Sequence, residues 1–174
     1  IADDMAKHGA GPVIHVGDLV DRGPDSRGVI DYLMQGQARG QDWTVLKGNH
    51  DRMFARFLHD PFEPEPGLRA DLGWRHPKLG GTSTLASYGV EKAADRPVAR
   101  VHAEALDAVP QAHLDYLNGL PVLHRLGETA FVHAGIRPGI ALDQQTETDL
   151  IWIREPFLSE PASFGPLIVH GHTA

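Results

Sequence analysis

The chain has 174 residues, of which 41% are hydrophobic and 22% charged, and its net charge is −7 at neutral pH. This length fits a single domain, and no apolar run approaches the roughly 20 residues that span a bilayer, so we expect a soluble, cytoplasmic protein without a membrane partner. The acidic balance disfavours a broad nucleic-acid surface. The absence of cysteine excludes disulfides and thiolate metal sites, so any metal must be held by oxygen and imidazole ligands.

Residues 1–8 are typical of the tail of a helix, and the pattern of a strand followed by a helix comes next. The run PVIHVGD at 12–18 predicts a short buried strand that ends in a polar loop. Apolar residues at helical spacing follow it, with Asp25 or Ser26 as the N-cap and Gly36 or Gly40 beyond the last turn.

The same arrangement occurs a second time. WTVLKGNHD at 43–51 combines an apolar strand, a glycine and a polar cluster, and RMFARFLH at 52–59 predicts a second helix. Alternating strands and helices indicate a parallel sheet with helices on its faces, where functional sites gather at the carboxyl ends of the strands.

The segment from 60 to 120 differs from the rest of the chain. A proline-rich loop, DPFEPEPG, comes first, and helical patterns follow at 82–89, 101–109 and 111–120. Since no strand is evident there, we interpret 60–120 as a helical cap or insertion over the sheet edge, within a single domain that covers 1–174.

Strand patterns resume in the last third of the chain. PVLHRLG at 121–127 and TAFVHAG at 129–135 predict two strands, TETDLIWIREPFL at 146–158 predicts a helix, and PLIVHGHT at 166–173 predicts a final strand.

Four of the expected strand ends carry the blocks GDLVDRG, GNHD, HAG and HGHT. If these strands are neighbours, their polar residues converge on one rim of the sheet. The residues expected there are Asp18, Asp21, Arg22, Asn49, His50, Asp51, His133, His170 and His172. Carboxylate, amide and imidazole ligands suit Mn, Fe or Zn, and a carboxylate can bridge two such ions. A guanidinium in the same loop offers a planar fork for two phosphate oxygens.

These four blocks, in this order, resemble the calcineurin-like metallophosphoesterases. The similarity is greatest to the phosphoprotein phosphatase branch, whose motifs G-D-x-V-D-R-G and G-N-H-E or G-N-H-D stand here complete. FVHAGIRPG at 131–139 and IVHGHT at 168–173 are more similar to bacterial serine/threonine phosphatases and symmetrical diadenosine tetraphosphatases than to the eukaryotic enzymes. The resemblance implies an α/β fold of layered sheets with flanking helices, here a fragment truncated at both ends.

The resemblance also implies a set of metal ligands. Asp18 matches the ligand that bridges two divalent ions, Mn before Fe or Zn, while Asn49, His133 and His172 match the shell of the second ion. His170 lies two residues before His172, so in a strand both would share a face, and it is a further candidate for ligation or substrate contact. The alternative is that these residues are turn, cap or strand-end residues without a ligand.

The catalytic roles implied by the resemblance involve the remaining polar residues. His50 matches the general acid that protonates the leaving oxygen, Asp21 matches the residue that orients it, and Arg22 matches a phosphate clamp. Arg154 and Arg137 are further candidates for substrate contact, with surface ion pairs as the alternative.

The expected function is therefore that of a dinuclear phosphoesterase in which metal-bound hydroxide attacks the phosphate. Phosphoserine or phosphothreonine in proteins, or a related phosphate ester, is the leading substrate. One alternative is a symmetrical dinucleoside tetraphosphate hydrolase, and another is an impaired module that only binds phosphate or protein. The partner is thus a phosphorylated protein or a nucleotide, and the sequence leaves the oligomeric state open.

One expected block is absent from the chain. The family's first motif, D-x-H-G, does not occur, because Asp3 and Asp4 are not followed by a suitably placed histidine. A βαβ unit spans about 30 residues, so we expect a D-x-H motif roughly ten residues before Ile1.

Overall fold

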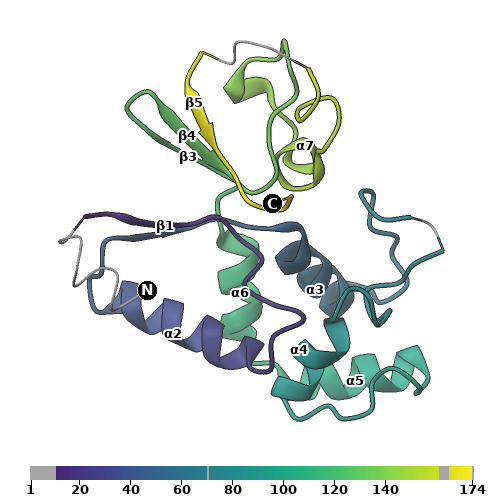
Figure 1. Cartoon of the computed structure of the whole chain (residues 1–174). Helices are drawn as coiled ribbons and strands as arrows, with labels where there is room; N and C mark the ends of the chain where they lie inside the picture. Colours follow the sequence, from purple (N-terminus) through teal and green to yellow (C-terminus); the bar gives the residue numbers. More distant parts are fainter. Residues whose placement is uncertain (1–10, 70, 161–164, 174) are drawn as a thin grey trace.

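The computed structural model describes residues 11–69, 71–160 and 165–173 (Figure 1), so the helix tail expected at 1–8 lies outside the described residues. In the first sheet, β1 (Val13–His15) pairs in parallel with β2 (Trp43–Val45). This pairing confirms the parallel arrangement expected for the first two strands, and it places the two polar loops that follow them at the same end of the sheet.

The second sheet contains three strands and is drawn above the first sheet and the helices α2 to α6 (Figure 1). β3 (Leu123–Leu126) and β4 (Thr129–Val132) form an antiparallel hairpin, and β5 (Leu167–Val169) pairs in parallel with β4. The sheet is therefore mixed, while the carboxyl ends of β4 and β5 lie together, as the convergence of the HAG and HGHT blocks requires.

The helix α2 (Ser26–Ala38) has the boundaries that its flanking residues predict. Asp25 is the N-cap, and its Oδ1 accepts a hydrogen bond of 2.8 Å from the backbone N–H of Gly28. Gly40, with a φ of 81°, follows the C-cap in the left-handed conformation that favours glycine. Gly36 lies inside the helix, where a side chain would collide with the ring of Trp43.

The sequence pattern suggested a helix that begins at Arg52. The helix α3 (Asn49–His59) begins three residues earlier, at Asn49. Gly48 is its N-cap, and Oδ2 of Asp51 accepts a 2.7 Å hydrogen bond from the Gly48 backbone N–H. Asn49 and His50 therefore belong to the rigid first turn of a helix and not to a loop.

Three helices follow in the 60–120 segment, and its described residues contain no strand, as expected. They are α4 (Gly81–Ser87), α5 (Val98–Ala108) and α6 (Gln111–Gly119), and they pack against α2 and α3 (Figure 1). Leu85 and Leu117 are fully buried and belong to the main hydrophobic core. The segment is thus part of the principal packing unit, and its description as a cap or insertion stays a prediction.

A second hydrophobic cluster lies between the second sheet and α7 (Glu147–Trp152), which the short 3-10 helix η1 (Leu142–Gln144) precedes. α7 ends at Trp152, earlier than the helix expected over 146–158: Ile153 has already left the helical conformation with a ψ of 138°, and Pro156 lacks the backbone N–H that would continue the helix. Trp152 packs against both clusters and so connects them. No helix in the described residues is long and apolar enough to cross a membrane.

Candidate active site

Polar side chains from both sheets meet at the rim that the sequence predicted. Asp18 follows β1, Asn49 opens α3 after β2, His133 follows β4 and His172 follows β5. Ligand atoms of Asp18, His133 and His172 all lie within 4.8 Å of one another, and Oδ1 of Asn49 lies 2.9 Å from Nε2 of His133. The structure therefore brings together four of the five predicted metal ligands.

The imidazole of His133 determines the chemical character of this cluster. Its Nδ1 donates a 2.7 Å hydrogen bond to the carbonyl of Val16, and burial lowers its pKa, so the ring is neutral with a lone pair on Nε2. This Nε2 faces Oδ1 of Asn49 at 2.9 Å, Nδ1 of His172 at 3.2 Å and Oδ1 of Asp18 at 3.3 Å. These four atoms can all accept a hydrogen bond, and only the ring of His172 can place a proton among them. A cluster of acceptor atoms fits a divalent cation bound between them.

His172 is also held in the form that binds metal. Burial lowers its pKa to about 4, and the electrostatic influence of the neighbouring His133 ring and of the Arg154 guanidinium acts in the same direction. Its Nε2 is buried and makes no hydrogen bond in the described part of the chain, and the edge of its ring faces Trp152. A neutral imidazole at neutral pH is the state that a metal ligand requires.

Asp51 joins the two loops that carry Asp18 and Asn49. Its Oδ2 accepts from the backbone N–H of Asp18 at 3.0 Å, and its Oδ1 accepts from that of Leu19 at 2.9 Å, in addition to the bond from the α3 N-cap. Its complete burial raises its pKa to about 7, although these hydrogen bonds act in the opposite direction. Gly17, with a φ of 93°, packs so closely on Gly48 that a Cβ would collide. Asp51 therefore fixes the register between the two loops.

A second cluster, beside the first, contains the predicted acid and phosphate clamp. Nδ1 of His50 lies 2.5 Å from Oδ2 of Asp21, and both residues are buried. Arg22 donates from its guanidinium to Nε2 of His50 at 3.2 Å. A hydrogen bond from the backbone N–H of His50 to Oδ1 of Asp18, 3.1 Å long, links the two clusters.

Backbone strain is concentrated at these residues. Within the described ranges, five residues other than glycine have a positive φ, and four of them are Asp18 (57°), Asp21 (72°), Arg22 (60°) and His172 (59°). Left-handed backbone is costly for residues with a Cβ and persists where function or the surrounding structure demands it. This distribution is independent of the motifs and marks the same site.

Three further candidates take different positions. The ring of His170 packs edge-on against Phe157, because β5 ends at Val169 and the strand alternation that would place it beside His172 does not continue. Arg137 donates to both oxygens of Asp149, at 3.0 and 2.5 Å, and so stands apart from the cluster. Arg154 lies close enough to His172 for its charge to lower the pKa of that ring.

The structure adds two residues that the sequence did not single out. Trp74 and Thr84, both from the 60–120 segment, donate hydrogen bonds to the carboxylate of Asp21. The signal in the sequence that could have indicated this contact was the pair Gly80 and Gly81. A Cβ on Gly80 would collide with Arg22, and a Cβ on Gly81 would collide with Trp74.

The sequence profile of the calcineurin-like phosphoesterases, named Metallophos, matches residues 4–174 and so spans both clusters. The chain belongs to the calcineurin-like phosphoesterase family. This membership confirms the family and the α/β fold inferred from the four sequence blocks, and it identifies the protein as a metal-dependent phosphoesterase.

Comparison with solved structures agrees with this fold. A crystal structure described as that of "a putative diadenosine tetraphosphatase" is 21% identical to this chain and superposes with a TM-score of 0.58. The match covers 99% of this chain and 68% of the other, and at this identity it shows a common fold. No curated protein matches the sequence.

Proposed function

We propose that this protein is a dinuclear, metal-dependent phosphoesterase that hydrolyses phosphoserine or phosphothreonine in proteins, or a related phosphate monoester. The observation that carries the proposal is the convergence of acceptor atoms around Nε2 of His133. This group of acceptor atoms lies next to a histidine–carboxylate pair, His50 and Asp21, and to an arginine, Arg22. Metal ligands, a proton donor and an anion clamp are the components that phosphate-ester hydrolysis needs.

The ligand set proposed is Asp18, Asn49, His133 and His172, with Asp18 shared between two ions. Divalent ions in such a site supply Lewis acidity and activate water as the nucleophile, so no serine or cysteine nucleophile is required. The oxygen and imidazole donors accept Mn, Fe or Zn, and we propose Mn as the preferred ion. The hydrogen bond from His133 to the carbonyl of Val16 orients that ring and fixes its tautomer.

His50 and Arg22 act on the two ends of the scissile bond. Asp21 holds the proton on Nδ1 of His50, so in its imidazolium form the ring carries a second proton on Nε2, which it transfers to the leaving oxygen and so becomes neutral. Arg22 donates to Nε2 in this structure and is exposed, so an incoming phosphate can replace His50 as its partner. Arg154 adds a second cation near His172, whereas Arg137 is left out of the proposal because Asp149 occupies its guanidinium.

Metal dependence tests the proposal. The protein should hydrolyse p-nitrophenyl phosphate and a phosphothreonine peptide when Mn²⁺ is supplied, and exhaustive chelation should abolish both activities. Parallel assays with Fe²⁺ and Zn²⁺ test the preferred ion. Full activity after chelation would refute the dinuclear mechanism, and inactivity toward every ester in the presence of each ion would favour a module that only binds phosphate or protein.

A second candidate substrate is a symmetrical dinucleoside tetraphosphate. The observation that favours it is the structural likeness to the diadenosine tetraphosphatase described above. Symmetrical cleavage of diadenosine tetraphosphate would yield two molecules of nucleoside diphosphate, which chromatography resolves. A kcat/KM for this substrate well above that for phosphothreonine peptides would make the nucleotide the preferred class.

A further inference from the structure

The carboxylate of Asp21 has partners on all sides. Its side chain is 0% exposed. Oδ2 accepts from Nδ1 of His50 at 2.5 Å and from Nε1 of Trp74 at 2.9 Å, and Oδ1 accepts from the hydroxyl of Thr84 at 2.7 Å. A buried carboxylate without such donors would be strongly disfavoured, so these bonds decide how it is oriented.

Thr84 holds Asp21 at two points. Besides donating to Oδ1, its Oγ accepts a 2.8 Å hydrogen bond from the backbone N–H of Asp21. Ser26 also accepts from this N–H, at 3.2 Å. The side chain and backbone of Asp21 are thus fixed to the first turns of α4 and α2. These bonds hold Asp21 in a backbone conformation with positive φ, which is intrinsically costly.

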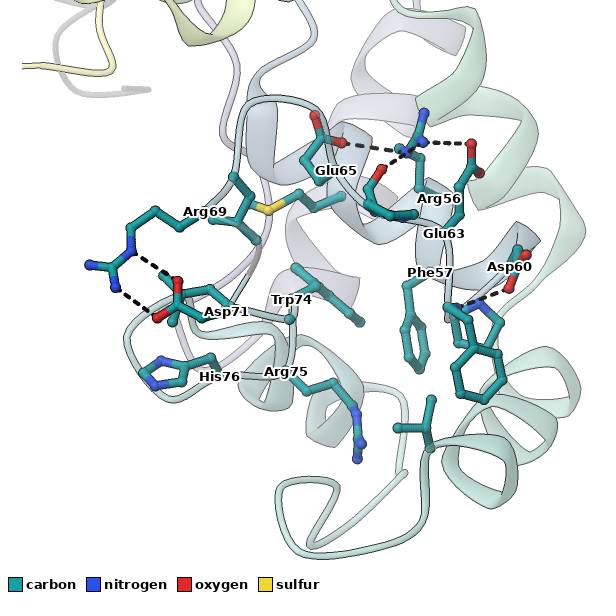
Figure 2. Close-up of a pocket in the computed structure, with 18 of the residues that line it drawn as sticks. Arg56, Phe57, Asp60, Glu63, Glu65, Arg69, Asp71, Trp74, Arg75 and His76 are labelled. Carbon is teal, nitrogen blue, oxygen red and sulfur yellow. Dashed lines mark hydrogen bonds and ion pairs between the residues drawn. The ribbon is translucent and has the colours of Figure 1, made fainter.

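Trp74 is itself held in place. Its ring stacks on Phe54 with centroids 5.3 Å apart and lies against Phe57 at 4.9 Å. A Cβ at Gly81 would collide with the indole, so α4 begins directly against it. Figure 2 shows Trp74 and Phe57 on the wall of a cavity of about 650 Å³ that the 53–77 segment helps to form. The indole N–H therefore reaches Asp21 from a rigid aromatic cluster.

We propose that Trp74 and Thr84 are positioning residues for proton delivery, because they fix the carboxylate of Asp21 so that its Oδ2 holds Nδ1 of His50. Neither residue touches the reacting atoms, so both act through Asp21. The inference rests on the proposed function, in which His50 protonates the leaving oxygen. It also assigns a role to the 60–120 segment, since both residues come from it.

Conservative variants separate positioning from packing. Trp74→Phe removes the indole N–H but keeps an aromatic ring, and Thr84→Val removes the hydroxyl at nearly constant shape. Trp43→Phe is the matched control, because Trp43 is buried in the same core and the hydrogen bonds of Asp21 do not involve it. The assay compares an alkyl phosphate, whose leaving group needs a proton, with p-nitrophenyl phosphate, whose leaving group does not.

We expect Trp74→Phe and Thr84→Val to lower kcat for the alkyl phosphate roughly 10- to 100-fold, as small misplacements of catalytic groups do. The kcat for p-nitrophenyl phosphate and the Mn²⁺ content should stay near those of the wild type, and Trp43→Phe should affect both esters little. Equal losses for the two esters in both variants would overturn the proposal. If Trp74→Phe does not fold, Thr84→Val alone decides.

A double-mutant cycle supplies the second criterion. In a His50→Asn background, Trp74→Phe and Thr84→Val should cause no further loss for the alkyl phosphate, because the group they position is already gone. Additive losses would mean that the two residues act independently of His50 and would overturn the proposal.

A spectroscopic measurement distinguishes failure of this inference from failure of the proposed function. In the wild type, the Nδ1 proton of His50 should give a downfield NMR signal because of its short bond to Asp21. Both variants should shift or broaden that signal, and Trp43→Phe should not. A wild type inactive toward all esters would refute the proposed function, whereas an unchanged signal in the variants would refute the clamp on Asp21.

Discussion

Nε2 of His133 lies 2.9 Å from Oδ1 of Asn49, while Nδ1 of the same ring is fixed on a backbone carbonyl. Two residues that are distant in the sequence thus point lone pairs at one position. His133→Ala and Asn49→Ala should each weaken Mn²⁺ binding at least about 10-fold, because each removes a donor atom. His59→Ala is the control, since His59 is exposed at the far end of α3. Isothermal titration measures the affinities, and unchanged Mn²⁺ binding in His133→Ala would contradict the ligand assignment.

The rim of the site could be predicted from the sequence because its determinants are local. Each of the blocks around Asp18, Asn49, His133 and His172 combines a strand with the ligand that follows it, and the order of elements places the strand ends together. The close packing of Gly17 on Gly48, which leaves no room for a Cβ, is a tertiary contact that the sequence analysis did not predict.

The parts that could not be predicted depend on tertiary contacts. Trp74 and Thr84 reach Asp21 across 53 and 63 positions of sequence, and nothing local to either residue indicates such a partner. The early start of α3 depends on the capping hydrogen bond from Gly48 to Asp51, which makes residues 49–51 helical although the sequence pattern suggested a loop there. His170 was placed beside His172 by strand alternation, which applies only within the strand.

The low pKa of His172 predicts how stability depends on pH. The pKa is about 4 in the folded protein and near 6.5 in the unfolded chain, so between these values the unfolded state binds more protons. In the presence of chelator, the free energy of unfolding should therefore decrease as the pH falls from about 6.5 toward about 4, with no contribution from His172 above that range. Urea unfolding at about pH 7.5 and about pH 5 measures the difference, which should be smaller in His172→Asn. An equal difference in the variant would contradict the assignment.

The positive φ of Arg22 predicts a difference in stability between two variants that both lack its guanidinium. Arg22→Gly and Arg22→Ala both remove the guanidinium, so both should raise KM for phosphate esters. Glycine tolerates a φ of 60° and alanine does not, so Arg22→Gly should be more stable than Arg22→Ala by about 0.5–1 kcal/mol. Urea unfolding compares the two variants. Greater stability of the alanine variant would show that the loop relaxes and carries no strain.

The pairing of His50 with Asp21 predicts a dependence on the leaving group. His50→Asn should lower turnover of an alkyl phosphate by roughly 10²–10⁴, the usual contribution of a general acid, while metal content stays near normal. The loss should be much smaller for p-nitrophenyl phosphate, since nitrophenolate leaves without a proton. Equal losses for alkyl and aryl esters would argue against proton delivery by His50.

A buried ionic cluster holds the proline-rich loop against α7. The side chain of Glu65 is 6% exposed, and its Oε1 accepts a 2.9 Å hydrogen bond from Nε1 of Trp152 and a further bond from Arg52. Oε2 lies 3.5 Å from Nε of Arg56. Because Trp152 in turn faces the ring of His172, this cluster supports one wall of the metal site.

Glu65→Ala should lower the free energy of unfolding by about 1–3 kcal/mol, because the buried donors of Arg52 and Trp152 lose their acceptor, while Arg52 keeps Glu147 and Arg56 keeps Glu63 as partners. The matched control is Asp71→Ala, which removes the partner of Arg69 in an ion pair whose side chains are 77% and 61% exposed. An exposed pair of this kind contributes at most about 1 kcal/mol, since water and salt screen both charges. Urea unfolding of both variants in low and high salt measures the contrast, and only the small Asp71→Ala effect should shrink with salt. A loss in Glu65→Ala no larger than that in Asp71→Ala would mean that water replaces the carboxylate and that the cluster does not hold the loop.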